Sequence, residues 1–176
     1  MVKKTGVDQF KTKGKAKGWF FSEEATISVI VRGIVIGQLQ DDSCLAACAR
    51  MLAADKNIQI PESHLRELLK IDDGGYLSDL PQILQQIGIS AQYHYRRDLT
   101  IEELRRSLIS GDAIVYLENK EKFGHAVVVE NITDMYVILR DPLPAGEGRG
   151  YQVRLDTFLE FWLIDSVRGR AVFVVN

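Results

Sequence analysis

The chain has 176 residues, 46% of them hydrophobic, and a formal net charge of -2 at pH 7. This length and apolar content suffice for one substantial hydrophobic core, so we expect a single folded domain. The near-neutral charge excludes a strong long-range attraction to nucleic acid or to an anionic membrane surface, and no apolar stretch approaches the roughly 20 residues that a membrane-spanning helix needs.

The first 18 residues differ in composition from the rest of the chain. They hold six lysines and a single acid, Asp8, without regularly spaced apolar residues. Such a segment is typical of a solvated tail or linker, and a basic docking arm is the alternative. We therefore expect residues 1–18 to be a flexible tail or linker and residues 19–176 to form the domain.

Residues 19–88 are predicted to be mostly helical. The β-branched run 26–31, which follows the aromatic residues 19–21, indicates an extended segment at the edge of the domain. Helical periodicity and capping residues then predict three helices: one capped by Asp42 or Ser43 that starts at Cys44 and ends near residues 55–57, one opened by Pro61, and one from Ser78 or Asp79 to Gly88.

From residue 89 onward the apolar period changes to that of strands. Thr100 and Glu103 form a capping box for one helix, which ends near Gly111, and residues 133–135 predict a tight hairpin. The expected strands are 89–95, 113–118, 125–132, 136–140, 151–153 and 171–175, with a short helix over 156–162. A helical half followed by a mostly antiparallel half predicts an α+β fold, with a cleft where the halves meet.

Three residues have the pattern of a cysteine nucleophile, its base and the group that orients the base. Cys44 is predicted in the first turn of a helix, where free N–H groups and the helix dipole stabilise a thiolate. His125 follows Gly124 at the start of one strand, and the hairpin brings Asp141, at the end of the next strand, beside it. This arrangement activates a thiol, so we predict a cysteine hydrolase.

The other cysteine and the other histidines are expected to have no part in this chemistry. Cys48 lies one turn deeper in an alanine-rich stripe and is expected in the core, while His64 and His94 lack a neighbouring acid. A zinc site from the two cysteines and a histidine lacks a fourth ligand and the usual spacing, so we expect neither metal nor cofactor. Two free thiols one helical turn apart suit a reducing compartment such as the cytoplasm.

Several motifs occur in order along the chain. They are Gln38 six residues before Cys44, the helix Cys44 to Leu52, Gly75-Tyr76-Leu77 leading to Leu80 and Gly88, Gly124-His125-Ala126-Val127-Val128-Val129, and Asp141-Pro142. With them the chain resembles, from about residue 33 to 175, the papain-like double-glycine leader peptidases found as the peptidase domain of bacteriocin exporters. The resemblance implies a papain-like fold and catalytic roles for Cys44, His125 and Asp141. It also implies that the Gln38 side chain and the Cys44 backbone N–H bind the oxyanion.

The same resemblance implies an endopeptidase that cuts a protein or peptide substrate after a Gly-Gly pair. The chain departs from the family pattern beside the cysteine, with Ser43 and Leu45 where members usually have an acid and a glycine. The long loop after Asp141, and an end directly after the last strand, look like papain-like domains of interbacterial toxins. We therefore expect an effector that is delivered into a rival cell and blocked in the producing cell by an immunity protein.

Three alternatives to an effector protease stay open. The first is a leader peptidase that matures bacteriocin-type precursors. The second is a papain-like glutamine deamidase or transglutaminase, because the same three residues form a thioester from a side-chain amide as readily as from a peptide bond. The third is a catalytically silent binding module, which the presence of Cys44, His125, Asp141 and Gln38 disfavours.

Overall fold

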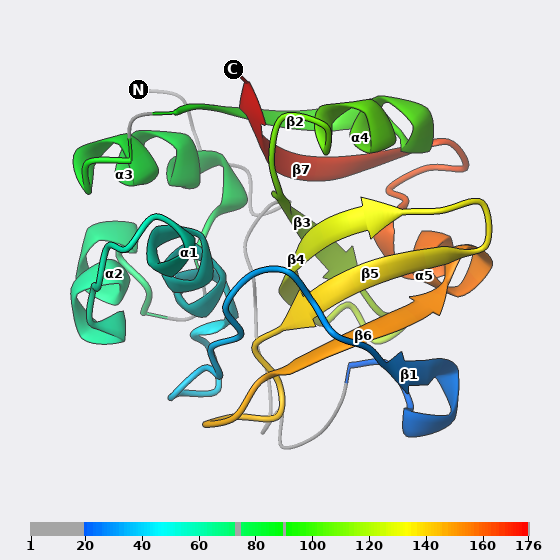
Figure 1. The fold of residues 1–176 in the computed structure, drawn as a ribbon, viewed down its shortest axis with the longest axis horizontal. Helices are drawn as coiled ribbons and strands as arrows, with labels where there is room; N and C mark the ends of the chain where they lie inside the picture. Colours follow the sequence, from blue (N-terminus) through cyan, green and yellow to red (C-terminus); the bar gives the residue numbers. More distant parts are fainter. Residues whose placement is uncertain (1–19, 73–74, 90, 176) are drawn as a thin grey trace.

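The structure, a computed structural model, describes residues 20–72, 75–89 and 91–175, so the predicted tail over residues 1–18 lies outside the described residues. Its centre is a seven-stranded sheet in which all neighbouring strands are antiparallel (Figure 1). In order across the sheet, the strands are β1 (Thr26–Ser28), β6 (Arg149–Arg154), β5 (Tyr136–Asp141), β4 (Gly124–Ile132), β3 (Ala113–Glu118), β7 (Arg168–Val175) and β2 (Gln92–Thr100).

The α-helices divide into a group of three and two that lie apart from it. Figure 1 shows α1, α2 and α3 together beside the sheet, whereas α5 lies behind β5 and β6. The helices are α1 (Cys44–Asp55), α2 (Glu62–Leu69), α3 (Leu80–Gln86), α4 (Ile101–Ser107) and α5 (Leu155–Trp162), with short 3-10 turns at Glu23–Ala25 and Leu77–Asp79. None of the helices in the described ranges is both long and apolar enough to cross a membrane.

The sheet separates two hydrophobic cores, because alternate residues of a strand point to opposite faces. Ala126 and Val128 of β4 belong to the core shared with α1, α2 and α3. Val127 and Val129 belong to the core shared with α4 and α5. The apolar run of β4 is therefore buried on both faces, and each fully buried valine contributes about 1.5–3 kcal/mol to folding.

Helix α1 begins at Cys44 as predicted, but the prediction of its cap was wrong. Ser43 stands at the N-cap position without a side-chain hydrogen bond to the helix. The Arg66 guanidinium of α2 binds both the Asp42 carboxylate and the Ser43 hydroxyl, the latter at 2.6 Å. A charged donor competes well for these oxygens because charge-assisted hydrogen bonds are the stronger ones. The first N–H groups of α1 therefore have no side-chain cap.

Most elements after residue 89 lie where the sequence predicts them, including the capping box of Thr100 and Glu103 at α4. The first strand of this half is the exception, because β2 covers Gln92–Thr100 instead of residues 89–95. It pairs with β7 along this length, with an irregular register between Arg96 and Leu99. The charged residues 96–98 resemble a loop in the sequence, yet charges are common in a strand at the edge of a sheet.

Candidate active site

The predicted nucleophile, base and orienting acid come from three elements that meet at one end of the sheet. Cys44 is the first residue of α1, His125 the second of β4 and Asp141 the last of β5. Val128 pairs with Arg140 across β4 and β5, and this register continued by one residue puts Asp141 near His125 on the same face. All three catalytic candidates are buried, with Cys44 and Asp141 wholly inaccessible to solvent.

Asp141 is held by hydrogen bonds from three directions. Its Oδ1 atom lies 2.7 Å from Nε2 of His125 and accepts a hydrogen bond of 2.9 Å from the backbone N–H of Leu143. Its Oδ2 atom accepts a hydrogen bond of 2.5 Å from the hydroxyl of Tyr151 in β6. The carboxylate is thus fixed on both oxygens, so it can hold the imidazole in one orientation and one tautomer.

The charge state of His125 follows from its surroundings. Burial lowers the pKa of His125, but the charge of Asp141 and its hydrogen bond outweigh burial and raise that pKa from 6.5 to about 10. A hydrogen bond with Cys44, and the charge of that side chain, raise it further. Because Nε2 is bonded to Asp141, Nδ1 is the ring nitrogen left for proton exchange with the thiol. The site therefore favours an imidazolium beside Cys44.

Cys48 lies in the hydrophobic core one turn further along α1, as expected from the sequence. Burial, with the nearby charges of Cys44 and Asp141, raises the pKa of the Cys48 thiol well above its usual value near 9. A thiol that stays protonated is a poor nucleophile. The two cysteines of the chain thus have different environments, and only Cys44 contacts the imidazole.

Gln38 is buried, and its backbone is tied to the loop that follows Asp141. Its N–H donates to the carbonyl of Pro142 at 3.0 Å, and its carbonyl accepts from the N–H of Gly146 at 2.8 Å. Its side-chain Nε2 donates to the carbonyls of Gln40 and Asp41, at 2.8 and 3.1 Å, while Oε1 is buried without a partner. The amide therefore lies against the short loop that leads into α1, with its donors bound to that loop.

The two histidines that were expected to have no part in catalysis lie at the surface. His64 and His94 are exposed on α2 and β2, and His94 stacks on Phe173 of β7. Gln40 is also exposed. Within residues 20–72, 75–89 and 91–175, no three His, Cys, Asp or Glu side chains form a cluster that could hold a metal ion.

Sequence analysis missed the role of Tyr151, which it placed only within a strand. The pairing of β5 with β6 puts Leu139 opposite Tyr151 and Asp141 opposite Arg149. Tyr151 and Asp141 are therefore diagonal neighbours on one face of a hairpin. The contact could have been predicted if residues 142–148 had been interpreted as a hairpin loop, because such a hairpin pairs the strands that hold Asp141 and Tyr151.

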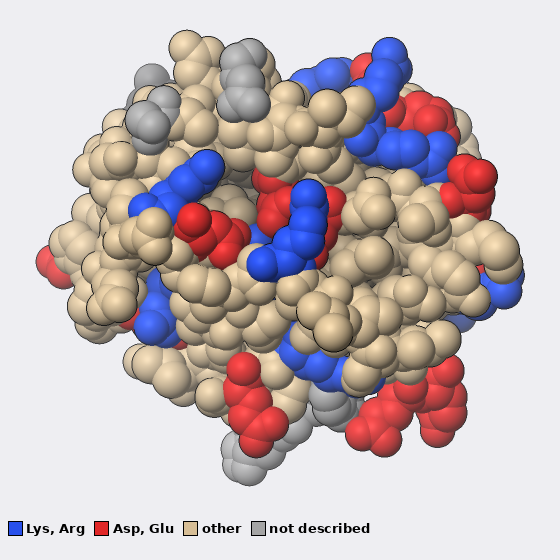
Figure 2. Space-filling view, in the orientation of Figure 1, with Lys and Arg blue, Asp and Glu red and all other residues tan. Residues whose placement is uncertain are grey.

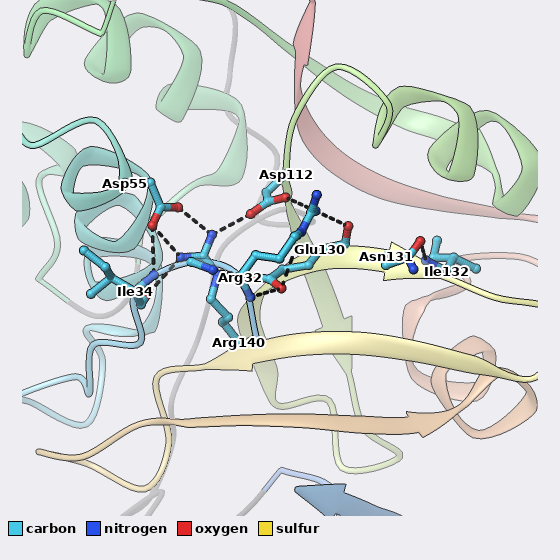
Figure 3. A network of polar contacts seen from close by, with 9 residues as sticks. Arg32, Ile34, Asp55, Asp112, Glu130, Asn131, Ile132 and Arg140 are labelled. Carbon is cyan, nitrogen blue, oxygen red and sulfur yellow. Dashed lines mark hydrogen bonds and ion pairs between the residues drawn. The ribbon is translucent and has the colours of Figure 1, made fainter. Parts of the chain in front are cut away.

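Arg140, adjacent to Asp141 in β5, is fully buried in a cluster of carboxylates (Figure 3). Its guanidinium lies 2.7 Å from Asp55 at the end of α1 and 2.7 Å from Asp112 before β3. Its Nε atom lies 2.9 Å from Glu130 of β4. Three carboxylates from different elements thus share one cation, and this cluster fixes α1, with its N-terminal cysteine, against the sheet.

Arg32 extends this cluster to the surface. Its side chain, 69% exposed, pairs with Asp112 at 3.0 Å, and the backbone N–H groups of Arg32 and Gly33 donate to Glu130. A Cβ atom at Gly33 would overlap the Arg140 guanidinium, so this close approach requires glycine. Figure 2 shows Lys and Arg beside Asp and Glu around the middle of this face, which is therefore not a single-sign surface.

Comparison with known proteins shows the family and the fold of the chain. The sequence model of the Peptidase C39 family matches residues 33–163. The chain belongs to this family. It is therefore a cysteine peptidase, and its α+β fold is that of the papain-like C39 peptidases. No curated protein matches the chain.

Solved structures with this fold include three similar ones. A double glycine motif protease from an AMS/PCAT transporter, in complex with the leader peptide, has a TM-score of 0.63 and 18% identity, over 81% of this chain and 91% of that chain. The peptidase domain of Streptococcus ComA has a TM-score of 0.63 and 19% identity, over 80% and 96%. A C39-like peptidase from Bacillus anthracis has a TM-score of 0.62 and 18% identity, over 83% and 98%.

Proposed function

We propose that this peptidase is an endopeptidase that cuts peptides after a Gly-Gly pair, with Cys44 as nucleophile, His125 as acid and base, and Asp141 as the orienting acid. The observation that carries the proposal is the buried contact between His125 and Asp141 at 2.7 Å, together with a side-chain hydrogen bond between Cys44 and the same imidazole. Each group has a partner that its role requires.

The reaction follows from these contacts. The Cys44 thiolate attacks the carbonyl carbon of the scissile bond, and the electron pair of the C=O bond moves to oxygen. As this intermediate collapses, His125 gives its proton to the leaving amine, and a thioester to Cys44 remains. His125 then takes a proton from water, the hydroxide displaces the Cys44 sulfur, and the carboxylic acid leaves. Asp141 keeps the imidazole aligned in both steps.

The oxyanion needs hydrogen-bond donors that are in place before it forms. The first N–H groups of α1 have no side-chain cap, which leaves the backbone N–H of Cys44 as one donor. The Gln38 amide is the second donor in this proposal. Its Nε2 donates to the Gln40 and Asp41 carbonyls in the structure, so the bound substrate must take over one of these hydrogens.

The preference for a Gly-Gly pair rests on family membership and on the neighbours. One of these structures is a double glycine motif protease in complex with a leader peptide, and its similarity in fold extends over most of this chain. Glycine residues before the scissile bond fit a narrow cleft, because such a cleft excludes side chains. Ser43 and Leu45 flank the nucleophile here, so the preference is a property to measure on this chain.

Cleavage of short peptides tests the proposal. Quenched fluorescent peptides with a central Gly-Gly pair are compared with matched Ala-Ala peptides, and the new amino termini are sequenced. We expect cleavage after Gly-Gly by the wild type and none by Cys44→Ala. Release of ammonia from glutamine without new amino termini would indicate the deamidase instead. If neither peptide cleavage nor ammonia release differs between the wild type and Cys44→Ala, the chain is a binding module.

For the biological role we propose an effector deployed against rival bacteria, acting in the reducing cytoplasm of the target cell and blocked by an immunity protein over the cleft. Support comes from the long loop of residues 142–148, which lies against the Gln38 backbone. Cytoplasmic expression in a bacterial host is expected to stop growth for the wild type and not for Cys44→Ala. Normal growth with active wild type would favour maturation of a bacteriocin-type precursor.

A further inference from the structure

The face of the His125 ring is covered by an aromatic side chain from outside the part of the chain that matches the family. The Phe20 ring is stacked on the imidazole, with 5.2 Å between centroids and 22° between planes. Phe20 lies outside the matched residues 33–163, on the N-terminal side, and the edge strand β1 lies between it and the start of the match. His125 is only 4% exposed with Phe20 in this position.

Phe20 is held by other aromatic rings. Its ring meets Phe161 of α5 edge-on at 5.3 Å, and it meets Phe21 edge-on at 5.6 Å. Phe21 is itself buried and lies 6.2 Å from Tyr151, whose hydroxyl binds the orienting carboxylate. Edge-to-face contacts at these distances are favourable beyond the apolar area that they bury. The stack on His125 is therefore one contact of a packed aromatic cluster.

We propose that Phe20 is a positioning residue for His125, which covers the imidazole face, excludes water from the hydrogen bond to Asp141 and stabilises the imidazolium. The inference rests on the proposed role of His125 as acid and base. A cation within about 6 Å of an aromatic centroid gains roughly 0.5–1 kcal/mol at exposed sites and more where water is excluded. A hydrogen bond inside a water-excluding site is also stronger than one in water.

The groups that titrate around His125 are few, so the effect of Phe20 can be separated from theirs. Asp141 of β5 and Cys44 of α1 act directly on the ring, and Tyr151 of β6 lies behind Asp141. On the other neighbouring strand, Leu117 of β3 pairs with His125 and carries no charge. Phe20 adds a π-face to this group without adding a titratable atom.

The test measures the ionisation of the site without a substrate. Iodoacetate alkylates a thiolate and is attracted by an adjacent imidazolium, so its rate at Cys44 is expected to follow a bell-shaped pH profile. The alkylated residue is identified by peptide mass spectrometry. The full chain is compared as wild type, Phe20→Ala, Phe20→Leu and Phe20→Tyr. Phe173→Ala is the matched control, because it removes a phenylalanine stacked on the exposed His94.

In Phe20→Ala the alkaline limb is expected to move down by about 0.5 pH unit, and kcat for a Gly-Gly peptide to fall about threefold to tenfold with little change in KM. Phe20→Tyr restores both values, and Phe173→Ala leaves both at the wild-type level. Phe20→Leu, which keeps the apolar volume without the ring, restores folding but not the alkaline limb. Thermal unfolding of each variant shows that the comparison is made between folded proteins.

Two results would overturn this role. The first is a folded Phe20→Ala protein with the wild-type profile and kcat, and the second is full recovery of the alkaline limb in Phe20→Leu. Failure of the proposed function gives a different result, namely a wild-type protein without a bell-shaped profile at Cys44.

Discussion

Replacement of Arg140 by methionine removes the one cation shared by Asp55, Asp112 and Glu130 while it keeps most of the apolar stem. The guanidinium is fully buried, and Glu130 is buried beside it. In Arg140→Met these three carboxylates lose that partner, and Arg32 is left to pair with Asp112 from the surface. The variant therefore tests whether the cluster stabilises the fold.

The cost can be estimated from burial. Removal of one partner from a buried ion pair typically costs about 3–5 kcal/mol, because the remaining charge is left uncompensated. Asp55 and Asp112 are 23% and 13% exposed, so water reaches them in part and the lower end applies. We expect a loss of about 3 kcal/mol in the free energy of unfolding, which for a chain of this size lowers Tm by roughly 6–12 °C.

The loss depends on pH, and its sign follows from Asp112. Burial raises the pKa of Asp112 and the charge of Arg140 lowers it, so removal of the guanidinium raises this pKa further. A carboxyl group with a raised pKa in the folded state costs most stability above that pKa, where it is charged. As pH falls toward about 4, the ordinary pKa of an aspartate, Asp112 takes up its proton in the folded state at a higher pH than in the unfolded state. The loss of stability caused by its charge therefore declines. Arg140→Met is thus expected to approach the wild type between about pH 7 and pH 4.

Urea unfolding followed by circular dichroism at a series of pH values measures both quantities. Arg154→Met is the matched control, because the ion pair of Arg154 with Asp156 lies at the surface with side chains 60% and 63% exposed. Such surface pairs contribute little, so this control is expected to unfold like the wild type. A loss below about 1 kcal/mol at pH 7 in Arg140→Met, or a loss that does not decline with pH, would refute the reasoning.

Three further variants test the site. Gln38→Ala is expected to lower kcat about 100-fold with a smaller change in KM, as loss of an oxyanion donor does; steady-state kinetics that show only a KM effect would exclude this role. Asp141→Asn is expected to lower kcat about 100-fold and to retain more activity than Cys44→Ala, and equal, complete loss in both would contradict an orienting role. Tyr151→Phe is expected to cost about 1.5–3 kcal/mol in urea unfolding, since it removes a buried hydrogen bond to a carboxylate, and an unchanged midpoint would show that this bond is not formed.

The positions of Cys44, His125 and Asp141 could be predicted because each depends on local pattern. The start of one helix gives the position of Cys44, and the length of one hairpin gives the positions of His125 and Asp141, so neither prediction needs contacts between residues far apart in the sequence. The α4 capping box is local in the same way and is present. The family resemblance was confirmed by the match over residues 33–163.

The features that could not be predicted depend on residues far apart in the sequence. The cap of α1 is lost to Arg66, which lies 23 residues beyond Ser43. Phe20 reaches His125 only through the packing of α5 and β6 against the first residues described. The position of β2 follows from its pairing with β7, which has no signal in β2 itself. Contacts of this kind do not change the spacing of apolar residues in either segment, so the sequence pattern does not predict them.

Covalent labelling by a peptide that ends in a Gly-Gly chloromethyl ketone tests most directly whether His125 activates Cys44. We predict rapid labelling of the wild type at Cys44 alone, identified by peptide mass spectrometry, and strongly slowed labelling of His125→Ala. Labelling of Cys48, or an equal rate in wild type and His125→Ala, would contradict the assignment of Cys44 and His125 as the reacting pair.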